Sequence, residues 1–160
     1  MVIRTNIPNA SPPSMRHKAL DIPLPIVGPH GHVHEIKTTK WLGKVVHLVF
    51  WAQWCEPCRI ELPVLEKEQV EHRKDVQVVL IDVDSHASGR IAAAELAKQE
   101  APDIPLAFDK SGRLEITYNI HALPLHVLID RKGRIVTMFT STIYHRPQFE
   151  RLLDELISEK

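Results

Sequence analysis

The chain has 160 residues, 44% of them hydrophobic, with 20 basic and 20 acidic side chains and no formal net charge. A chain of this length is typical of one compact domain with its own core. The balanced charge, with no block of one sign, argues against nucleic acid and against an anionic membrane surface as partners. Two cysteines are too few for a disulfide framework, so cysteine usage indicates no cellular compartment.

Residues 1–19 are rich in Pro, Ser and Asn and show no hydrophobic periodicity. This composition predicts a flexible N-terminal arm or linker, followed by a single domain over residues 20–160. The chain has neither the apolar core of a signal peptide nor the apolar run of about eighteen residues that a membrane-spanning helix needs. We therefore expect that the chain itself does not span a membrane.

A β-hairpin is expected next. Residues 21–26 and 33–36 flank a turn over 27–32 that contains Gly and Pro. His30, His32 and His34 alternate here, so an extended backbone would place their side chains on one face. Two interpretations stay open: three solvated histidines, which we favour, and a copper or zinc cluster.

The motif with the most chemical content begins at Val45, where an apolar, β-branched run predicts a buried strand. The run turns through Trp54 into a Cys-x-x-Cys pair, Cys55 and Cys58, and then into a segment with helical spacing. Pro57 suits the first turn of a helix because its missing N–H would have no partner there. Unpaired N–H groups and the helix dipole favour a thiolate at a helix N-terminus. Cys55 is thus the expected nucleophile, and Cys58, one turn further, the expected resolving thiol.

Two structural interpretations of this cysteine pair are weaker. A structural zinc site usually takes four Cys or His ligands, and the chain has no second cysteine pair. An inert disulfide is less favoured still, because a bridge that closes so short a loop removes little entropy from the unfolded chain. A redox role is the better interpretation.

The rest of the chain alternates between helical and strand patterns. An amphipathic helix, bent at Pro63, is expected over residues 59–73, and a buried strand that ends in acidic turn residues over 75–84. The later elements are a helix over 88–100, a strand over 104–108, a short helix over 114–118, an apolar strand after Pro124, a strand over 134–139 and a closing helix over 147–159. This order predicts an α/β fold with parallel central strands in a mixed β-sheet flanked by helices.

The residues around the cysteines resemble a known family. Residues 50–58 are similar to the active-site signature of the thioredoxin superfamily. The Glu56-Pro57 dipeptide, with residues 59–63 after it, is more specifically similar to the TlpA/ResA-like branch of bacterial thiol-disulfide oxidoreductases. The resemblance covers roughly residues 20–158, and it includes the N-terminal hairpin and a helix-plus-strand insertion over 88–118. It implies a thioredoxin-like fold.

The same resemblance assigns roles near the cysteines. It places Pro124 at the superfamily's cis-proline, although composition alone would predict a trans bond. It implies that Leu123 presents backbone groups to an extended substrate segment and that Pro124 keeps metal ions from the dithiol. Trp54, Glu56 and Pro57 are expected to contact the client, with Trp54 as an exposed aromatic platform.

Thiol exchange also needs a proton acceptor for the attacking thiol of Cys58. Glu61 lies one helical turn beyond Cys58 and is our candidate, and in the resembling family an acidic residue at this point tunes the cysteines. The alternative is a solvated helix side chain. Plain thioredoxin uses an acidic residue on the preceding strand, at the position of Val49 here. His47 and His126, in apolar strands, are interpreted as satisfied core histidines.

The leading functional hypothesis is a thiol-disulfide oxidoreductase that exchanges its cysteine pair with protein clients through a mixed disulfide at Cys55. The resemblance implies a monomeric reductant outside the bacterial cytoplasm, which takes electrons from a membrane thiol carrier and serves, for example, cytochrome c maturation. It implies no cofactor beyond the redox-active Cys55–Cys58 disulfide and no metal. Residues 121–124 do not match the motif of the dedicated cytochrome-maturation reductants, so the client stays open.

Two other functions fit the sequence less well. A copper-binding or copper-delivery module could use the two thiols as soft ligands, but such modules on this fold generally space their cysteines by three residues. A peroxidase is disfavoured because Gln53 and Trp54 occupy the place where such enzymes need a hydroxyl residue and a polar shell.

Overall fold

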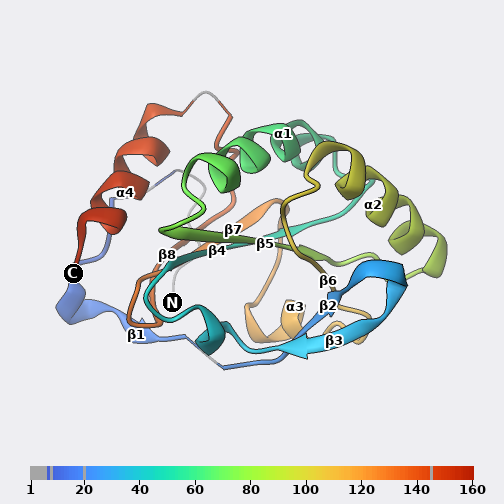
Figure 1. Cartoon of the computed structure of the whole chain (residues 1–160), viewed down its shortest axis with the longest axis horizontal. Helices are drawn as coiled ribbons and strands as arrows, with labels where there is room; N and C mark the ends of the chain where they lie inside the picture. Colours follow the sequence, from blue (N-terminus) through green and yellow to red (C-terminus); the bar gives the residue numbers. More distant parts are fainter. Residues whose placement is uncertain (1–6, 8, 20, 145) are drawn as a thin grey trace.

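The computed structural model of the protein describes residues 7, 9–19, 21–144 and 146–160. One eight-stranded mixed sheet runs through it in the order β1-β8-β7-β4-β5-β6-β2-β3 (Figure 1). Within the described ranges, no helix is long and apolar enough to cross a membrane. The strands are β1 (His17–Lys18), β2 (Leu24–Val27), β3 (Val33–Ile36), β4 (Val45–Trp51), β5 (Val76–Asp82), β6 (Leu106–Phe108), β7 (Leu125–Ile129) and β8 (Arg134–Phe139).

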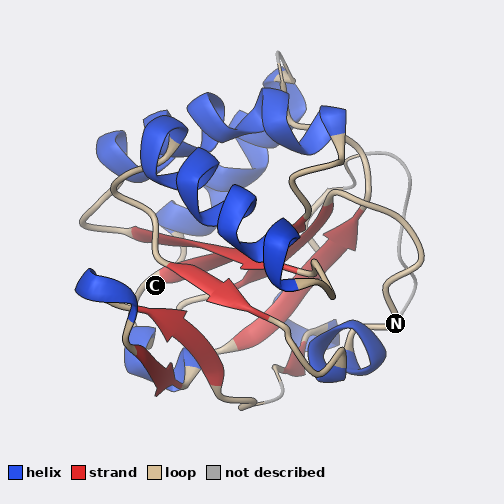
Figure 2. Cartoon of the chain, turned by 90° about the vertical axis from the view of Figure 1, so that its right-hand side faces the viewer, coloured by secondary structure: helices blue, strands red, loops and turns tan. Residues whose placement is uncertain are grey.

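The helices form two layers around this sheet, with the long ones together on one side (Figure 2). Their bounds are α1 (Glu56–Glu71), α2 (Ala87–Glu100), α3 (Arg113–Thr117) and α4 (Pro147–Ser158). Three short 3-10 turns complete the regular structure: η1 (Pro13–Met15), η2 (Pro29–Gly31) and η3 (Thr38–Trp41). The boundaries lie within a few residues of those expected from the hydrophobic pattern, and α1 continues through Pro63.

The centre of the sheet is apolar on both faces, which explains why its strands read as continuous hydrophobic runs. All seven residues of β4 are buried, and β4, β5 and β6 run parallel. Parallel neighbours need a crossover, and α1 and α2 provide the two crossovers. Phe50 packs on Tyr118 at the end of α3, whereas His47 packs on Phe149 of α4, with ring centroids 5.2 Å apart in each pair. The α/β, thioredoxin-like fold expected from the sequence is confirmed.

The predicted N-terminal hairpin is also confirmed. Strands β2 and β3 pair antiparallel over their full length, and β2 joins the main sheet through Ile26, opposite Ala107 of β6. The expected insertion is present as α2, β6 and α3. The hairpin therefore extends the sheet beyond the inserted strand rather than forming a separate unit.

The expected arm over residues 1–19 is attached to the domain in its last part. Strand β1 pairs with the start of β8, and the guanidinium of Arg16 is buried between Asp130 and Glu159, at 3.1 Å from Asp130 Oδ2. Residues 1–6 and 8 lie outside the described residues. The division into an arm and a domain stays a prediction, but Arg16 and β1 pack as part of the fold.

Candidate active site

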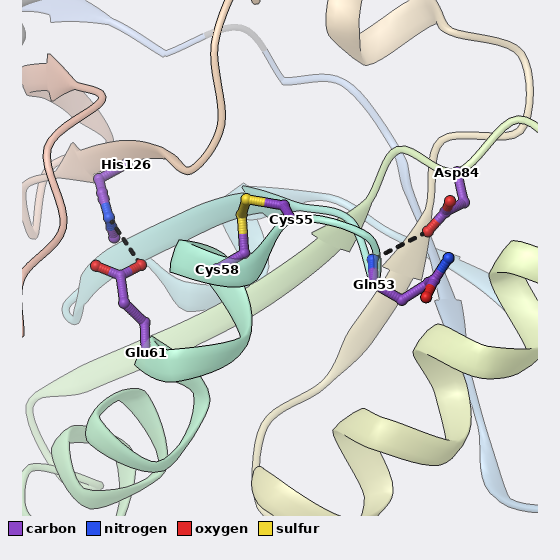
Figure 3. The surroundings of a disulfide bond; sticks show 6 residues. All are labelled: Gln53, Cys55, Cys58, Glu61, Asp84 and His126. Atoms are coloured by element: carbon purple, nitrogen blue, oxygen red, sulfur yellow. Dashed lines mark hydrogen bonds and ion pairs between the residues drawn. A yellow bond between two sulfur atoms is a disulfide. The ribbon is translucent and has the colours of Figure 1, made fainter.

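The two cysteines lie where β4 gives way to α1, and they form a disulfide (Figure 3). Cys55 is the N-cap residue of α1, and its N–H donates to the carbonyl of Ala52 at 3.1 Å. Pro57 stands in the first turn of the helix, as expected. Cys58 follows inside the helix, with its Cα 5.3 Å from that of Cys55, and both side chains are largely buried. The strand, Cys-x-x-Cys and helix order read from the sequence is therefore present.

The surface beside Cys55 has the exposed aromatic that the sequence indicated. Trp54 is 66% exposed, and Glu56 and Pro57 are exposed next to it, while Trp51 is fully buried in the core. Such a surface offers contact area to a partner close to the reactive sulfur. Client contact by these side chains stays a prediction.

The predicted cis bond between Leu123 and Pro124 is confirmed. Pro124 directly precedes β7, whose first residue, Leu125, is paired with Phe50 near the end of β4. Because β4 and β7 are antiparallel, Pro124 lies at the edge of the sheet where the chain turns toward Cys55. The substrate role of Leu123 and Pro124 stays a prediction.

Glu61 is fully buried, so the alternative of a solvated helix side chain is wrong. Its Oε1 accepts a hydrogen bond from the backbone N–H of Ile143. Its Oε2 lies 3.3 Å from Nε2 of His126, and neither of these two atoms has a hydrogen-bond partner among the described residues. Figure 3 shows Glu61 and His126 together on one side of the disulfide. The carboxylate is thus placed one turn after Cys58, and its role in proton transfer stays a prediction.

His126 leads to a second buried histidine. Its Nδ1 lies 2.9 Å from Nε2 of His47, and His47 Nδ1 lies 2.9 Å from Oε1 of Glu68 on α1. Both histidines are core residues, as expected, and both ring nitrogens of His47 are hydrogen-bonded, but Nε2 of His126 has no hydrogen-bond partner among the described residues, so the expectation of a satisfied histidine holds for His47 alone. Their contact with each other and with two carboxylates was not foreseen. The available signal was one histidine in each of two apolar strands, together with acidic residues seven positions apart on α1.

A pair of acidic residues lies on the other side of the disulfide. Asp84 Oδ2 accepts the backbone N–H of Gln53 at 3.2 Å, and Asp82 Oδ1 accepts the backbone N–H of Asp84 at 3.2 Å. Burial, then the hydrogen bond and charge of Asp84, raise the pKa of Asp82 to about 8. Asp82 Oδ2 and Trp51 Nε1, on paired positions of β5 and β4, are buried without a hydrogen-bond partner within the described chain. The sequence predicts Asp82 in the turn after the strand, but it is the last residue of β5.

The contacts described above around the cysteines do not include the histidines of the N-terminal hairpin. His30 precedes β3 in a left-handed backbone conformation, and His32 and His34 are exposed. Among the residues that the structure describes, no group of three or more His, Cys, Asp or Glu side chains is arranged to hold a metal ion.

Comparison with known proteins gives a consistent pattern. Residues 15–138 match the model of the AhpC/TSA family. The chain is 33% identical over 103 residues to the thiol-disulfide oxidoreductase ResA of Bacillus thuringiensis subsp. konkukian, which is 64% of this chain and 58% of the relative. It is 32% identical over 110 residues to the thioredoxin-like protein YneN of Bacillus subtilis, which is 69% of this chain and 64% of the relative. The alignments thus span less than two thirds of these relatives.

Two solved structures share most of the fold. A Chlorobium tepidum protein provisionally described as thiol:disulfide interchange protein DsbE superposes with a TM-score of 0.76 and 28% identity, covering 89% of this chain and 97% of that one. The exposed lipoprotein thioredoxin Etrx1 of Streptococcus pneumoniae superposes with a TM-score of 0.69 and 26% identity, covering 85% and 99%.

Proposed function

The chain belongs to the AhpC/TSA family of thioredoxin-like proteins, and from this premise we propose that it is a thiol-disulfide oxidoreductase that acts on cysteines of client proteins. The observation that carries the proposal is the Cys55–Cys58 disulfide at the N-terminus of α1, with the buried carboxylate of Glu61 one turn further along the helix. The name thiol-disulfide oxidoreductase borne by the ResA relatives supports it.

In the reductive direction, the thiolate of Cys55 attacks a client disulfide. A mixed disulfide forms between Cys55 and one client sulfur, and the other client sulfur leaves with the electron pair and takes up a proton. Cys58 then loses its proton to Glu61 and attacks the Cys55 sulfur, which releases the second client sulfur as a thiolate. The client gains two electrons and the Cys55–Cys58 pair is oxidised.

The working direction and setting are part of the proposal. We assign the protein to the reductants, as a monomer outside the bacterial cytoplasm that takes electrons from a membrane thiol carrier, in a role such as cytochrome c maturation. The description of one structural neighbour as an exposed lipoprotein thioredoxin supports the setting. The client contacts fall to Trp54, Glu56, Pro57, Leu123 and Pro124, which lie on or next to the segments around the cysteines.

A trapping experiment tests the exchange activity. A Cys58→Ser variant should accumulate a mixed disulfide with a protein substrate such as insulin, whereas a Cys55→Ser variant should trap none and should not reduce it. The reduction potential in glutathione buffer then tests the direction, and a value below about −200 mV would place the pair among reductants. Failure of the wild-type protein to reduce disulfides, together with stoichiometric binding of Cu(I), would favour the copper-binding alternative instead.

A further inference from the structure

Four buried polar side chains form a continuous line through the core between the sheet and α1. The line starts at Glu61, passes through His126 of β7 and His47 of β4, and ends at Glu68 on the same helix as Glu61. The links from His126 to His47 and from His47 to Glu68 are hydrogen bonds of 2.9 Å each. The third link is a contact of 3.3 Å between Glu61 Oε2 and His126 Nε2, two buried atoms that have no other hydrogen-bond partner among the described residues. Ionisable side chains are costly to bury, so four in one line call for a reason beyond packing.

The far end of this line lies at the wall of a pocket. Glu68 lines a pocket of about 320 Å³ between α4 and the C-terminal part of α1. The other titratable residues that line this pocket are Lys67, Glu71, His72, Tyr144, Glu150 and Asp154. The line therefore joins the buried carboxylate beside Cys58 to the carboxylate of Glu68, two turns along the helix, which is itself only 6% exposed but lines this pocket.

The rings in the line are held in place by apolar and backbone contacts. His126 stacks on Phe139 with ring centroids 4.8 Å apart, and His47 packs on Phe149 at 5.2 Å. The N–H of Ile143 donates a hydrogen bond to Oε1 of Glu61, and Oε2 of the same carboxylate faces His126. The line thus has both nitrogens of His47 and Nδ1 of His126 in hydrogen bonds, and Nε2 of His126 facing Oε2 of Glu61 at 3.3 Å.

The chemistry of imidazole lets such a line carry a proton. A neutral imidazole has one N–H and one acceptor nitrogen, so the direction of one link sets the direction of the next. In one arrangement Glu61 holds the carboxyl proton and Glu68 is ionised; in the other every proton has moved across its link, and Glu68 holds it. The shift moves one net proton from Glu61 to Glu68 and leaves both histidines neutral.

We propose that Glu61, His126, His47 and Glu68 form a proton relay that carries the proton released by Cys58 to the pocket between α1 and α4. The proposal rests on the proposed oxidoreductase function. When Cys58 attacks the mixed disulfide, its sulfur bonds to the Cys55 sulfur, and the client sulfur leaves with the electron pair of the broken bond. The proton of Cys58 passes to Glu61, and the relay delivers one proton to Glu68 and then to water. His126, His47 and Glu68 are positioning residues, since none of them touches the reacting sulfurs.

The test separates the two thiol steps with Ellman's reagent. Reduced protein releases one thionitrobenzoate when Cys55 attacks and a second when Cys58 attacks the mixed disulfide. We expect Glu68→Gln to leave the first phase unchanged, because the amide oxygen can still accept from His47. It should slow the second phase roughly 10-fold, a fraction of the 10²–10⁴-fold rate increase that acid–base catalysis supplies. The rate of the second phase should also become dependent on buffer concentration, because buffer would then have to take up the proton.

The matched control is Glu71→Gln, a residue of the same helix and pocket that is exposed and pairs with Lys67. It should behave as wild type. A second variant, His47→Gln, cannot relay a proton through its amide and should reproduce the slow second phase. Its folding is checked by the unchanged first phase and by thermal unfolding.

A solvent isotope measurement distinguishes a relay from a structural role. Because several protons move together, the second-phase rate of the wild type should depend on the deuterium fraction along a curve, and Glu68→Gln should lose that curvature. Wild-type rates, buffer independence and curvature in a folded Glu68→Gln protein would overturn the relay. If wild-type protein releases no second thionitrobenzoate at all, the oxidoreductase proposal fails rather than the relay.

Discussion

The backbone N–H of Ile143 donates a hydrogen bond to Oε1 of Glu61, which ties the segment between β8 and α4 to the helix that carries the cysteines. The carboxylate thereby keeps one orientation, with its second oxygen directed toward His126. A glutamine at this position would retain an acceptor for Ile143, but it would lose the negative charge and the ability to take a proton.

Glu61→Gln should therefore slow the attack of Cys58 while the protein stays folded. We expect a loss on the order of 10²-fold at neutral pH, the lower bound for a positioned general base. Stopped-flow measurement of the mixed-disulfide decay against pH checks this, with Glu71→Gln as the control. A pH–rate profile identical to that of the wild type would remove the role assigned to Glu61.

Asp82→Asn should change how stability depends on pH. The folded protein holds the Asp82 proton up to a pKa of about 8, whereas an unfolded Asp loses it near about 3.9. Between these values the unfolded state binds fewer protons, so the wild type loses stability as pH rises through this range and levels off above it. The variant should lack this loss and unfold at a higher temperature than wild type above about pH 8.

Melting curves across this pH range test the expectation, with Asp154→Asn, an exposed residue of α4, as the control. Asn at position 82 keeps the oxygen that accepts the Asp84 N–H. Parallel curves for wild type and Asp82→Asn would contradict it.

Gly89→Ala should destabilise the protein even though Ala normally stabilises a helix by about 1 kcal/mol relative to Gly. A Cβ at position 89 would lie 2.6 Å from Oδ1 of Asp84, closer than real contacts allow. Asp84 accepts the N–H of Gln53, two residues before Cys55, so its displacement should also alter Cys55 alkylation rates. Ser88→Ala, one residue earlier and exposed, is the control. A higher melting temperature for Gly89→Ala would refute the clash.

Arg16→Met should cost about 3 kcal/mol of stability, the lower end for removing one partner of a buried ion pair. Arg16 donates to Asp130 and to both carboxylate oxygens of Glu159, and its side chain is 1% exposed. Urea denaturation measures the loss, and Lys18→Met, exposed on β1, should show little of it. Equal stabilities of the two variants would mean that the buried guanidinium does not fasten this segment.

Local patterns account for what the sequence predicted well. The strand, turn and helix around Cys55 are contiguous, and their hydrophobic periods differ, so each element is visible in a short window. The same holds for the N-terminal hairpin, where Gly and Pro mark the turn between β2 and β3. The cis bond at Pro124 was predicted from family resemblance, since composition favours trans.

The contacts that the sequence does not predict depend on how distant strands and segments pair in the fold. His47 and His126 are 79 positions apart and meet only because β4 and β7 pair with His126 opposite Val49. Glu68 read as one of several charged helix positions, and nothing in the sequence distinguished it from Glu71. Arg16 lies in a segment without hydrophobic periodicity. Its burial depends on the carboxylates of Asp130, after β7, and Glu159, after α4, which are distant in the sequence.

The pairing of β1 with β8 determines at which end of the strands the N-terminal segment joins the sheet. Lys18 pairs with Arg134 at the start of β8, beside the turn after β7, whereas Pro124 precedes the opposite end of β7, near the cysteines. The chain therefore enters the sheet at the end remote from its dithiol. A molecule immobilised on a bead or an electrode through the residues before Arg16 would present its cysteine pair to the surrounding solution, so grafting at that end should leave access to bulky substrates unobstructed.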